Sequence, residues 1–103
     1  MTKKINENIL EQLFLTIKLR DKGKRINSYT KSLLKQGKNK IAQKIIEESS
    51  ELIIDYINGS KKRVIEEASD LLYHLMVLLY SKKISIKEIE KELTKRKKNV
   101  QQR

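Results

Sequence analysis

Two short clusters of acidic residues interrupt an otherwise basic sequence. The first, EESSE, spans residues 47–51, and the second, EEASD, spans residues 66–70. The chain has a formal net charge of +11, yet the stretch from 47 to 70 holds seven acids and only three bases. Carboxylates gathered beside apolar residues repel one another unless a cation lies between them. Because carboxylate oxygens are hard ligands that suit Mg²⁺ or Mn²⁺, the clusters predict a divalent-cation site.

A cation held by carboxylates favours phosphate chemistry. Mg²⁺ completes its coordination shell with water and substrate phosphates, so the predicted site binds a di- or triphosphate and activates water for attack on phosphorus. The excess of lysine agrees with a phosphorylated substrate. Lys40 and Lys44 share the helix arc of the first cluster and are the candidate phosphate-binding side chains. A duplex-binding protein has little reason to build an acidic centre, which argues against nucleic acid as the partner.

The same acids have a simpler interpretation, in which they form a solvated helix face. Nearby bases would then serve as counterions, namely Lys40, Lys44, Lys61 and Arg63. Asp70 favours the cation site, because a short acid inside the apolar stretch ASDLLYHLM is costly to bury without a strong partner.

Two aromatic side chains near the clusters have distinct expected roles. His74, the single histidine, lies on the polar stripe of a core helix. We expect it to be a hydrogen-bonded structural residue rather than a general base. Tyr29 lies in a polar segment near the mouth of the predicted site, whereas the other tyrosines and Phe14 are expected to pack in the core.

The chain has no proline and three glycines, which favours an all-α fold of a single domain over residues 1–103. Apolar residues at helical spacing and turn signals predict its elements. Helices are expected over about residues 5–20 and over 28–36, where Gly37 stops the second one. Two longer helices are expected over about 39–57 and 61–81, on either side of an NGS turn. The last helix is expected to start at the capping box SIKE (85–88) and to reach about residue 97, followed by a frayed basic tail.

The short NGS turn makes the two long helices antiparallel neighbours. Glu51 and Glu67 lie at similar distances from this turn, and Glu48 and Asp70 lie one helical turn further on, so the two acidic stripes face each other. The helix before the turn is amphipathic, with an apolar arc expected to be buried. The helix over 61–81 is apolar almost all round, which predicts a central position in a helical bundle.

Composition excludes several classes of protein. The absence of cysteine excludes disulfides and thiolate metal sites. No apolar run is long enough for a membrane span, and the N-terminus has no apolar segment of the signal-peptide type, so we expect a cytoplasmic protein without a membrane partner. A core built from 103 residues is small, which favours self-association.

The acidic motifs also carry a resemblance. EESSE at 47–51 followed by EASD at 67–70 resembles the EExxE…ExxD pattern of the all-α nucleotide pyrophosphohydrolase superfamily. More closely, SYTKSLLKQGKNKIAQKIIEESSELI at 28–53 and VIEEASDLLYHLMVLL at 64–79 are similar to the phosphoribosyl-ATP pyrophosphohydrolase family. The likeness covers about residues 28–93, most of the chain.

The resemblance implies an activity, a cofactor and an assembly. The reaction would be hydrolysis of the α–β phosphoanhydride of phosphoribosyl-ATP to phosphoribosyl-AMP and pyrophosphate, the second step of histidine biosynthesis. The cofactor would be Mg²⁺, with Mn²⁺ as an alternative. Helical hairpins would pair in a homodimer or larger assembly, and a cyclohydrolase on a separate chain would catalyse the next step. The implied metal ligands are Glu47, Glu48, Glu51, Glu67 and Asp70, with Glu66 as a further candidate, and all but Glu47 and Glu66 are also the catalytic candidates.

Two other functions fit parts of the sequence. The first is a related enzyme that cleaves ordinary or damaged nucleoside triphosphates, because the metal motif is common to both groups. Only the SYT segment at 28–30 and the DLLYH segment at 70–74 favour phosphoribosyl-ATP as the substrate. The second is a non-enzymatic basic helical module that binds nucleic acid or another helix.

Overall fold

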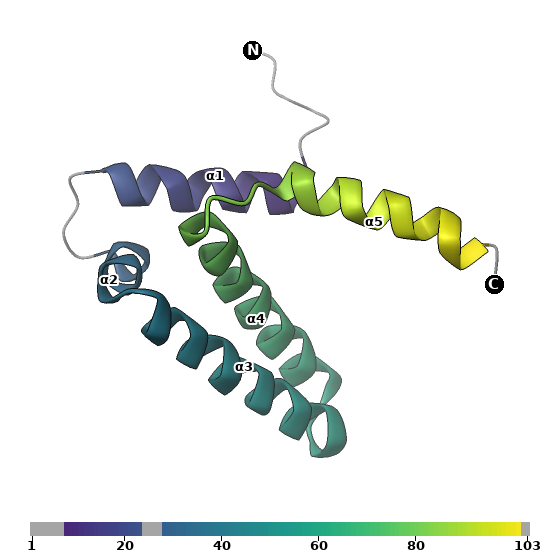
Figure 1. Ribbon diagram of the computed structural model, residues 1–103. Helices are drawn as coiled ribbons and strands as arrows, with labels where there is room; N and C mark the ends of the chain where they lie inside the picture. The colour runs from purple at the N-terminus through teal and green to yellow at the C-terminus, as the bar shows by residue number, and fades with distance from the viewer. Residues whose placement is uncertain (1–7, 24–27, 102–103) are drawn as a thin grey trace, which may run out of the picture.

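The computed structural model describes residues 8–23 and 28–101, except for the side chains of residues 98–101. This part of the chain is helical and contains no strand, which confirms the all-α fold. Its elements are α1 (Ile9–Lys22), α2 (Tyr29–Gln36), α3 (Lys38–Asn58), α4 (Lys61–Ser81) and α5 (Ile86–Gln101) (Figure 1).

Local signals in the sequence set most of the helix ends. The hydroxyl of Ser28 accepts a hydrogen bond from the backbone N–H of Lys31 and so caps α2. Gly37, at φ 97°, ends α2 in a conformation that glycine adopts without a steric penalty, and α3 starts directly after it. The expected capping box is present, since the backbone N–H groups of Ser85 and Glu88 each bond to the other's side chain.

The outer helices differ from their predicted bounds. Asn8 caps α1, which therefore begins at Ile9 rather than near residue 5, a position outside the described residues. The predicted end of the last helix near residue 97 came too early, because α5 continues to Gln101. No glycine or proline stops it there, and lysine, arginine and glutamate are good helix formers.

Helices α3 and α4 form an antiparallel hairpin, and the end of α4 far from the turn packs against α1 and α2 (Figure 1). As predicted, α4 is the central helix. The core lies at this end of the hairpin, where all five helices meet or begin. Its buried members are Ile17, Leu33, Ile41, Met76, Val77, Leu79 and Ile86.

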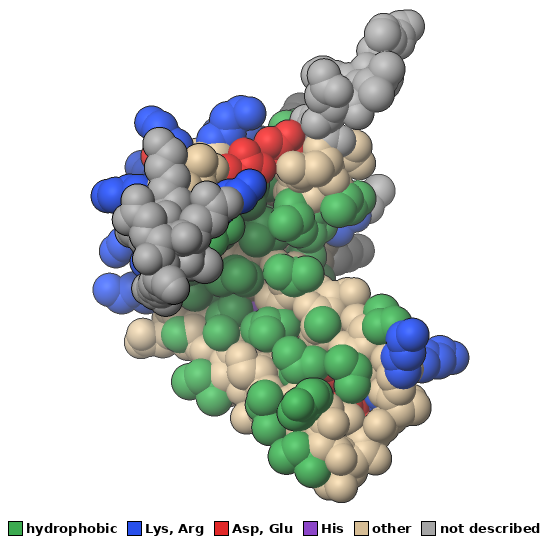
Figure 2. All heavy atoms as spheres, turned by 90° about the vertical axis from the view of Figure 1, so that its right-hand side faces the viewer, with side chains coloured by type: hydrophobic (Ala, Val, Ile, Leu, Met, Phe, Trp, Pro, Cys, Tyr) green, Lys and Arg blue, Asp and Glu red, His purple; other side chains and the backbone are tan. Residues whose placement is uncertain are grey.

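In the half of the α3–α4 hairpin nearer the turn, several large apolar side chains are exposed rather than buried. The expectation that the whole apolar arc of α3 is buried was wrong for a single chain, because Ile41 is buried whereas Tyr56 is 73% exposed. Among the described residues, only α4 packs against α3 here. The exposed apolar side chains form a surface that we call the distal apolar face (Figure 2): Ile46, Ile53, Ile54, Tyr56, Ile57, Ile65 and Leu72.

Within residues 8–23 and 28–101, no helix combines the length and the apolar character that crossing a membrane requires.

Candidate functional site

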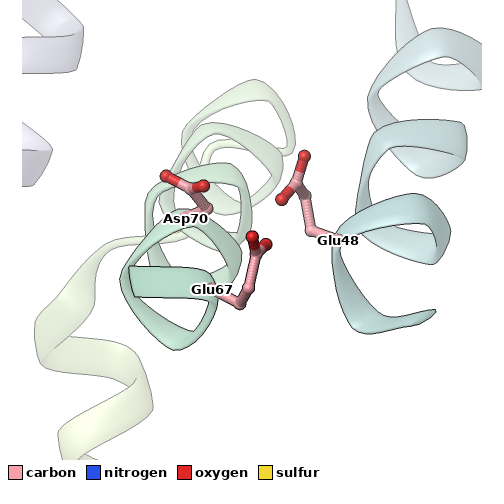
Figure 3. A group of neighbouring side chains, drawn as sticks. All are labelled: Glu48, Glu67 and Asp70. Carbon is pink, nitrogen blue, oxygen red and sulfur yellow. The ribbon is translucent and has the colours of Figure 1, made fainter. Parts of the chain in front are cut away.

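Three carboxylates converge in the middle of the α3–α4 hairpin. Glu48 projects from α3 toward Glu67 and Asp70 on α4 (Figure 3). One oxygen from each of the three lies within 4.8 Å of the others. The acidic stripes therefore face each other, as the register of the hairpin predicts. Small side-chain movements convert this spacing into part of the oxygen shell of one divalent cation.

The two glutamates of this cluster are buried, and each has one oxygen without a partner. Glu48 is 8% exposed and Glu67 is 5% exposed. The Oε2 atom of Glu48 lies 3.7 Å from Lys44 Nζ, and Oε2 of Glu67 lies 3.0 Å from Arg63 Nη2. The Oε1 atoms of both glutamates are buried without a hydrogen-bond partner. A buried carboxylate oxygen left bare is costly, and a cation between the two would satisfy both. The donor set thus fits Mg²⁺, and these two acids do not belong to a solvated helix face.

The structure corrects the argument made from Asp70. The sequence suggests that this acid is buried in the core, but its side chain is exposed. Within the described residues, Glu67 points toward Glu48 of α3, whereas Asp70 lies on a more exposed part of α4 (Figure 3). The cost of desolvation therefore falls on Glu48 and Glu67, and Asp70 completes the cluster from the solvent side.

Glu51 adjoins the cluster next to Glu67. Burial raises the pKa of Glu67, and the neighbouring carboxyl of Glu51 raises it further, because the two groups hydrogen-bond when one is protonated and repel when both are charged. The positive charge of Arg63 opposes this shift, and the charge of Asp70 adds to it. The cluster therefore carries like-charge repulsion that a cation would relieve.

Two other predicted ligands lie outside the group of three. Glu47 accepts a hydrogen bond from Gln43 Nε2 at 2.8 Å and pairs with Lys44 Nζ at 3.3 Å. These partners hold the pKa of Glu47 below its ordinary range. Glu66 is exposed and pairs with Arg63 at 3.2 Å. Metal binding by Glu47 or Glu66 stays a prediction.

Cationic side chains border the cluster on both helices. Burial alone would lower the pKa of Lys44, but its hydrogen bond to Glu47 and the nearby negative groups raise the value, so the amine stays charged. Lys40 also acts on Glu47 through its charge. On α4, Arg63 lies 3.5 Å from Asp55 of α3 and so ties the helices together. Because Arg63 engages only Oε2 of Glu67, the other oxygen stays available.

His74 lies one helical turn beyond Asp70 and is buried. Its Nδ1 atom lies 2.8 Å from the backbone oxygen of Asp70, and its Nε2 atom lies 2.8 Å from the hydroxyl of Tyr29. The expected hydrogen-bonded histidine is confirmed. Its link to Tyr29 was not predicted from the sequence, because it joins α2 to α4 across 45 positions and no local spacing reports such a pair.

Comparison with known proteins adds independent information. The sequence pattern of the family described as phosphoribosyl-ATP pyrophosphohydrolase matches residues 10–97. Phosphoribosyl-ATP pyrophosphatase of Sulfolobus acidocaldarius is 40% identical over 94 residues, which cover 91% of this chain and 99% of the relative. The protein of the same name from Bacillus cytotoxicus is 44% identical over 90 residues, 87% of this chain and 84% of the relative.

A third relative is a longer protein. The histidine biosynthesis bifunctional protein HisIE of Bacteroides thetaiotaomicron is 49% identical over 69 residues. These residues cover 67% of this chain and 34% of that protein. The whole carboxylate cluster, Lys44, Tyr29 and His74 lie inside the range that the family pattern matches.

Proposed function

The chain belongs to the phosphoribosyl-ATP pyrophosphohydrolase family, and from this premise we propose that its carboxylate cluster hydrolyses phosphoribosyl-ATP to phosphoribosyl-AMP and pyrophosphate. The protein is a hydrolase of histidine biosynthesis, as its relatives are named. The observation that carries the assignment to this cluster is the pair of buried, unpartnered oxygens, Oε1 of Glu48 and Oε1 of Glu67, beside Asp70. If these glutamates only formed ion pairs with surface lysines, their Oε1 atoms would be hydrated rather than buried without a hydrogen-bond partner.

In the proposed mechanism, Glu48, Glu67 and Asp70 would hold Mg²⁺, or Mn²⁺ in its place. When bound, the cation neutralises charge on the phosphates and lowers the pKa of the attacking water. Lys44 remains cationic beside Glu48 and offers its ammonium hydrogens to phosphate oxygens. Glu51 is exposed next to Glu67, so its carboxylate can orient the water and accept its proton. The oxygen of the water forms a bond to one phosphorus of the α–β anhydride, the bond between that phosphorus and the bridging oxygen breaks, and the electron pair of the broken bond leaves with the bridging oxygen.

The substrate is tested by measuring pyrophosphate release from phosphoribosyl-ATP, ATP and deoxynucleoside triphosphates, with Mg²⁺ or with a chelator. We expect release from phosphoribosyl-ATP that the chelator abolishes, and poor release from the other nucleotides. Equal turnover of ordinary triphosphates would point instead to an enzyme that removes such nucleotides. No turnover of any substrate, with a salt-sensitive gel shift on DNA, would point to a basic binding module.

We also propose that the protein assembles as a homodimer or larger through the distal apolar face. Ile53, Ile57 and Ile65 are each more than half exposed within one chain, and together with their neighbours they cover a continuous part of the hairpin (Figure 2). Soluble monomers rarely leave large contiguous apolar surfaces uncovered. A second hairpin would bury this face and supply the remaining half of a bundle.

Light scattering checks this assembly at micromolar concentration. We expect a dimer or larger that changes little with moderate salt, since apolar contacts hold it. Ile53→Glu should shift the protein toward monomer, because it places a charge in the interface. Gln36→Glu, which makes the same change of charge at an exposed position on α2, away from the distal apolar face, should not. A wild-type monomer, or equal effects of the two variants, would contradict the proposed interface.

The next reaction of the pathway needs a partner enzyme. The Bacteroides relative is named as bifunctional and is about three times the length of the segment that this chain matches. We propose that a phosphoribosyl-AMP cyclohydrolase consumes the product of this enzyme, and that both activities operate in the cytoplasm on phosphorylated intermediates.

A further inference from the structure

A rigid polar pair borders the carboxylate cluster, and the mechanism above does not use it. The hydroxyl of Tyr29 lies 2.8 Å from His74 Nε2, and His74 is 6% exposed. The ring of Tyr73 packs edge-on against His74, with centroids 5.2 Å apart, and lies 6.2 Å from the ring of Tyr29. The hydroxyl of Tyr73 is itself bonded to buried Thr30. The pair is therefore held in one geometry by packing and by hydrogen bonds.

The hydrogen-bond partners of His74 fix which atom of the pair donates. The backbone carbonyl of Asp70 can only accept, so Nδ1 of His74 carries a hydrogen. In the tautomer that carries its hydrogen on Nδ1, Nε2 has a lone pair and accepts from the hydroxyl of Tyr29. Tyr29 has a single hydroxyl hydrogen, and it donates that hydrogen in its hydrogen bond to His74. Toward any bound ligand, the Tyr29 oxygen therefore offers only a lone pair.

Tyr29 also lies where a ligand of the cluster can reach it. Its side chain is 49% exposed although its hydroxyl is bonded to a buried residue. His74 lies one helical turn beyond Asp70 on α4, so the hydroxyl that it holds borders the cluster. A phosphate that is fully ionised has no hydrogen to give to a lone pair. A ribose hydroxyl has one, and riboses flank the phosphates of the substrate.

We propose that Tyr29, held by His74, accepts a hydrogen bond from a ribose hydroxyl of the bound nucleotide. The assignment rests on the proposed function and deepens it, because it names a group on the substrate that the site reads. Tyr29 is the substrate-binding residue of the pair, and His74 is its positioning residue.

The first test compares Tyr29→Phe with wild type on phosphoribosyl-ATP and on four analogues, each lacking one ribose hydroxyl. Phenylalanine keeps the ring and removes the acceptor. We expect kcat/KM for phosphoribosyl-ATP to fall roughly tenfold or more, and the two proteins to be equal on one of the four analogues. A loss of the same size on every analogue, or no loss on phosphoribosyl-ATP, would overturn the assignment.

The second test asks whether His74 acts through Tyr29. Leucine at position 74 removes the acceptor, whereas the amide oxygen of glutamine can replace Nε2. We expect His74→Leu to lower kcat/KM as much as Tyr29→Phe does. The double variant that combines these two substitutions should lower kcat/KM no further than either one alone, and His74→Gln should keep most of the wild-type value. Additive losses would show a merely structural histidine and overturn the coupling.

Tyr80→Phe is the matched control, because the Tyr80 hydroxyl donates to Asp21 at 2.6 Å and Tyr80 belongs to the core region rather than to the carboxylate cluster. This variant should keep wild-type kcat/KM even where it melts lower. These measurements distinguish an error in the role given to Tyr29 and His74 from an error in the proposed function. Turnover of phosphoribosyl-ATP that is indifferent to Tyr29→Phe overturns only the pair, whereas a wild type without turnover overturns both.

Discussion

Glu67→Gln is expected to lower pyrophosphate release from phosphoribosyl-ATP by roughly 10²–10³-fold, the scale of losing one preorganised electrostatic contact to a transition state. The substitution keeps the size of the side chain and removes the charge that faces Glu48 across the hairpin. Glu48→Gln and Asp70→Asn should cause losses of the same order, because each removes the negative charge of one of the three carboxylates that converge. Steady-state rates at saturating Mg²⁺ measure the effect.

Circular dichroism of the same variants separates a lost site from a lost fold. Helical content should stay unchanged, most clearly for Asp70→Asn, whose side chain is exposed. Glu92→Gln is the control, since Glu92 pairs only locally with Arg96 on α5, at 3.1 Å, and should leave the rate unchanged. Near-normal rates in all three cluster variants would remove the cluster from the mechanism.

The second large effect concerns stability and has an unusual sign. Most substitutions destabilise a protein, by about 1 kcal/mol, yet Glu67→Gln and Glu51→Gln should both melt higher than wild type in chelator. Each removes a negative charge from a cluster in which burial and like charges already oppose ionisation. The loss of the Arg63 pair in Glu67→Gln offsets little, because Arg63 is exposed and retains Asp55 and Glu66.

Mg²⁺ should reverse this order. A ligand that binds only the native state stabilises it by mass action, by about 2.7 kcal/mol at a hundredfold excess over Kd. The wild-type melting point should therefore rise with Mg²⁺, and the variants should gain less. Glu92→Gln should follow wild type in both conditions. If the cluster variants melt no higher than wild type in chelator, and Mg²⁺ does not shift wild type, the acids do not form a cation site.

The same melts have a predictable dependence on pH. The folded-state pKa of Glu67 is raised above its ordinary value of 4.5. An acid of this kind contributes stability that is present below 4.5 and is lost as the pH rises through the folded-state value. In chelator, the advantage of Glu67→Gln over wild type should therefore be absent at low pH and grow toward neutral pH.

Local chemistry explains why much of the fold could be predicted. The caps at Ser28 and Ser85, the stop at Gly37 and the NGS turn act within a few residues, so their effect can be read directly from the sequence. The short turn also fixes the register of the two long helices, and the register brings Glu48 opposite the acids of α4.

Features that depend on which helices cover which faces could not be predicted in this way. The exposure of Asp70 depends on how the helices are arranged around α4, which the sequence does not state. The hydrogen bond between Tyr29 and His74 depends on how α2 packs on α4. The apolar arc of α3 reads as core in the sequence, but within one chain its distal half remains exposed.

The most direct measurement is a crystal structure of the protein grown with Mn²⁺ and recorded at a wavelength where manganese scatters anomalously. We expect an anomalous peak between α3 and α4, with carboxylate oxygens of Glu48, Glu67 and Asp70 at about 2.1 Å. We also expect the Oε1 atoms of Glu48 and Glu67, which have no hydrogen-bond partner in the structure, to contact the ion. The absence of a peak there in crystals that bind manganese elsewhere, or a peak held by Glu47 and Glu66 alone, would contradict the account.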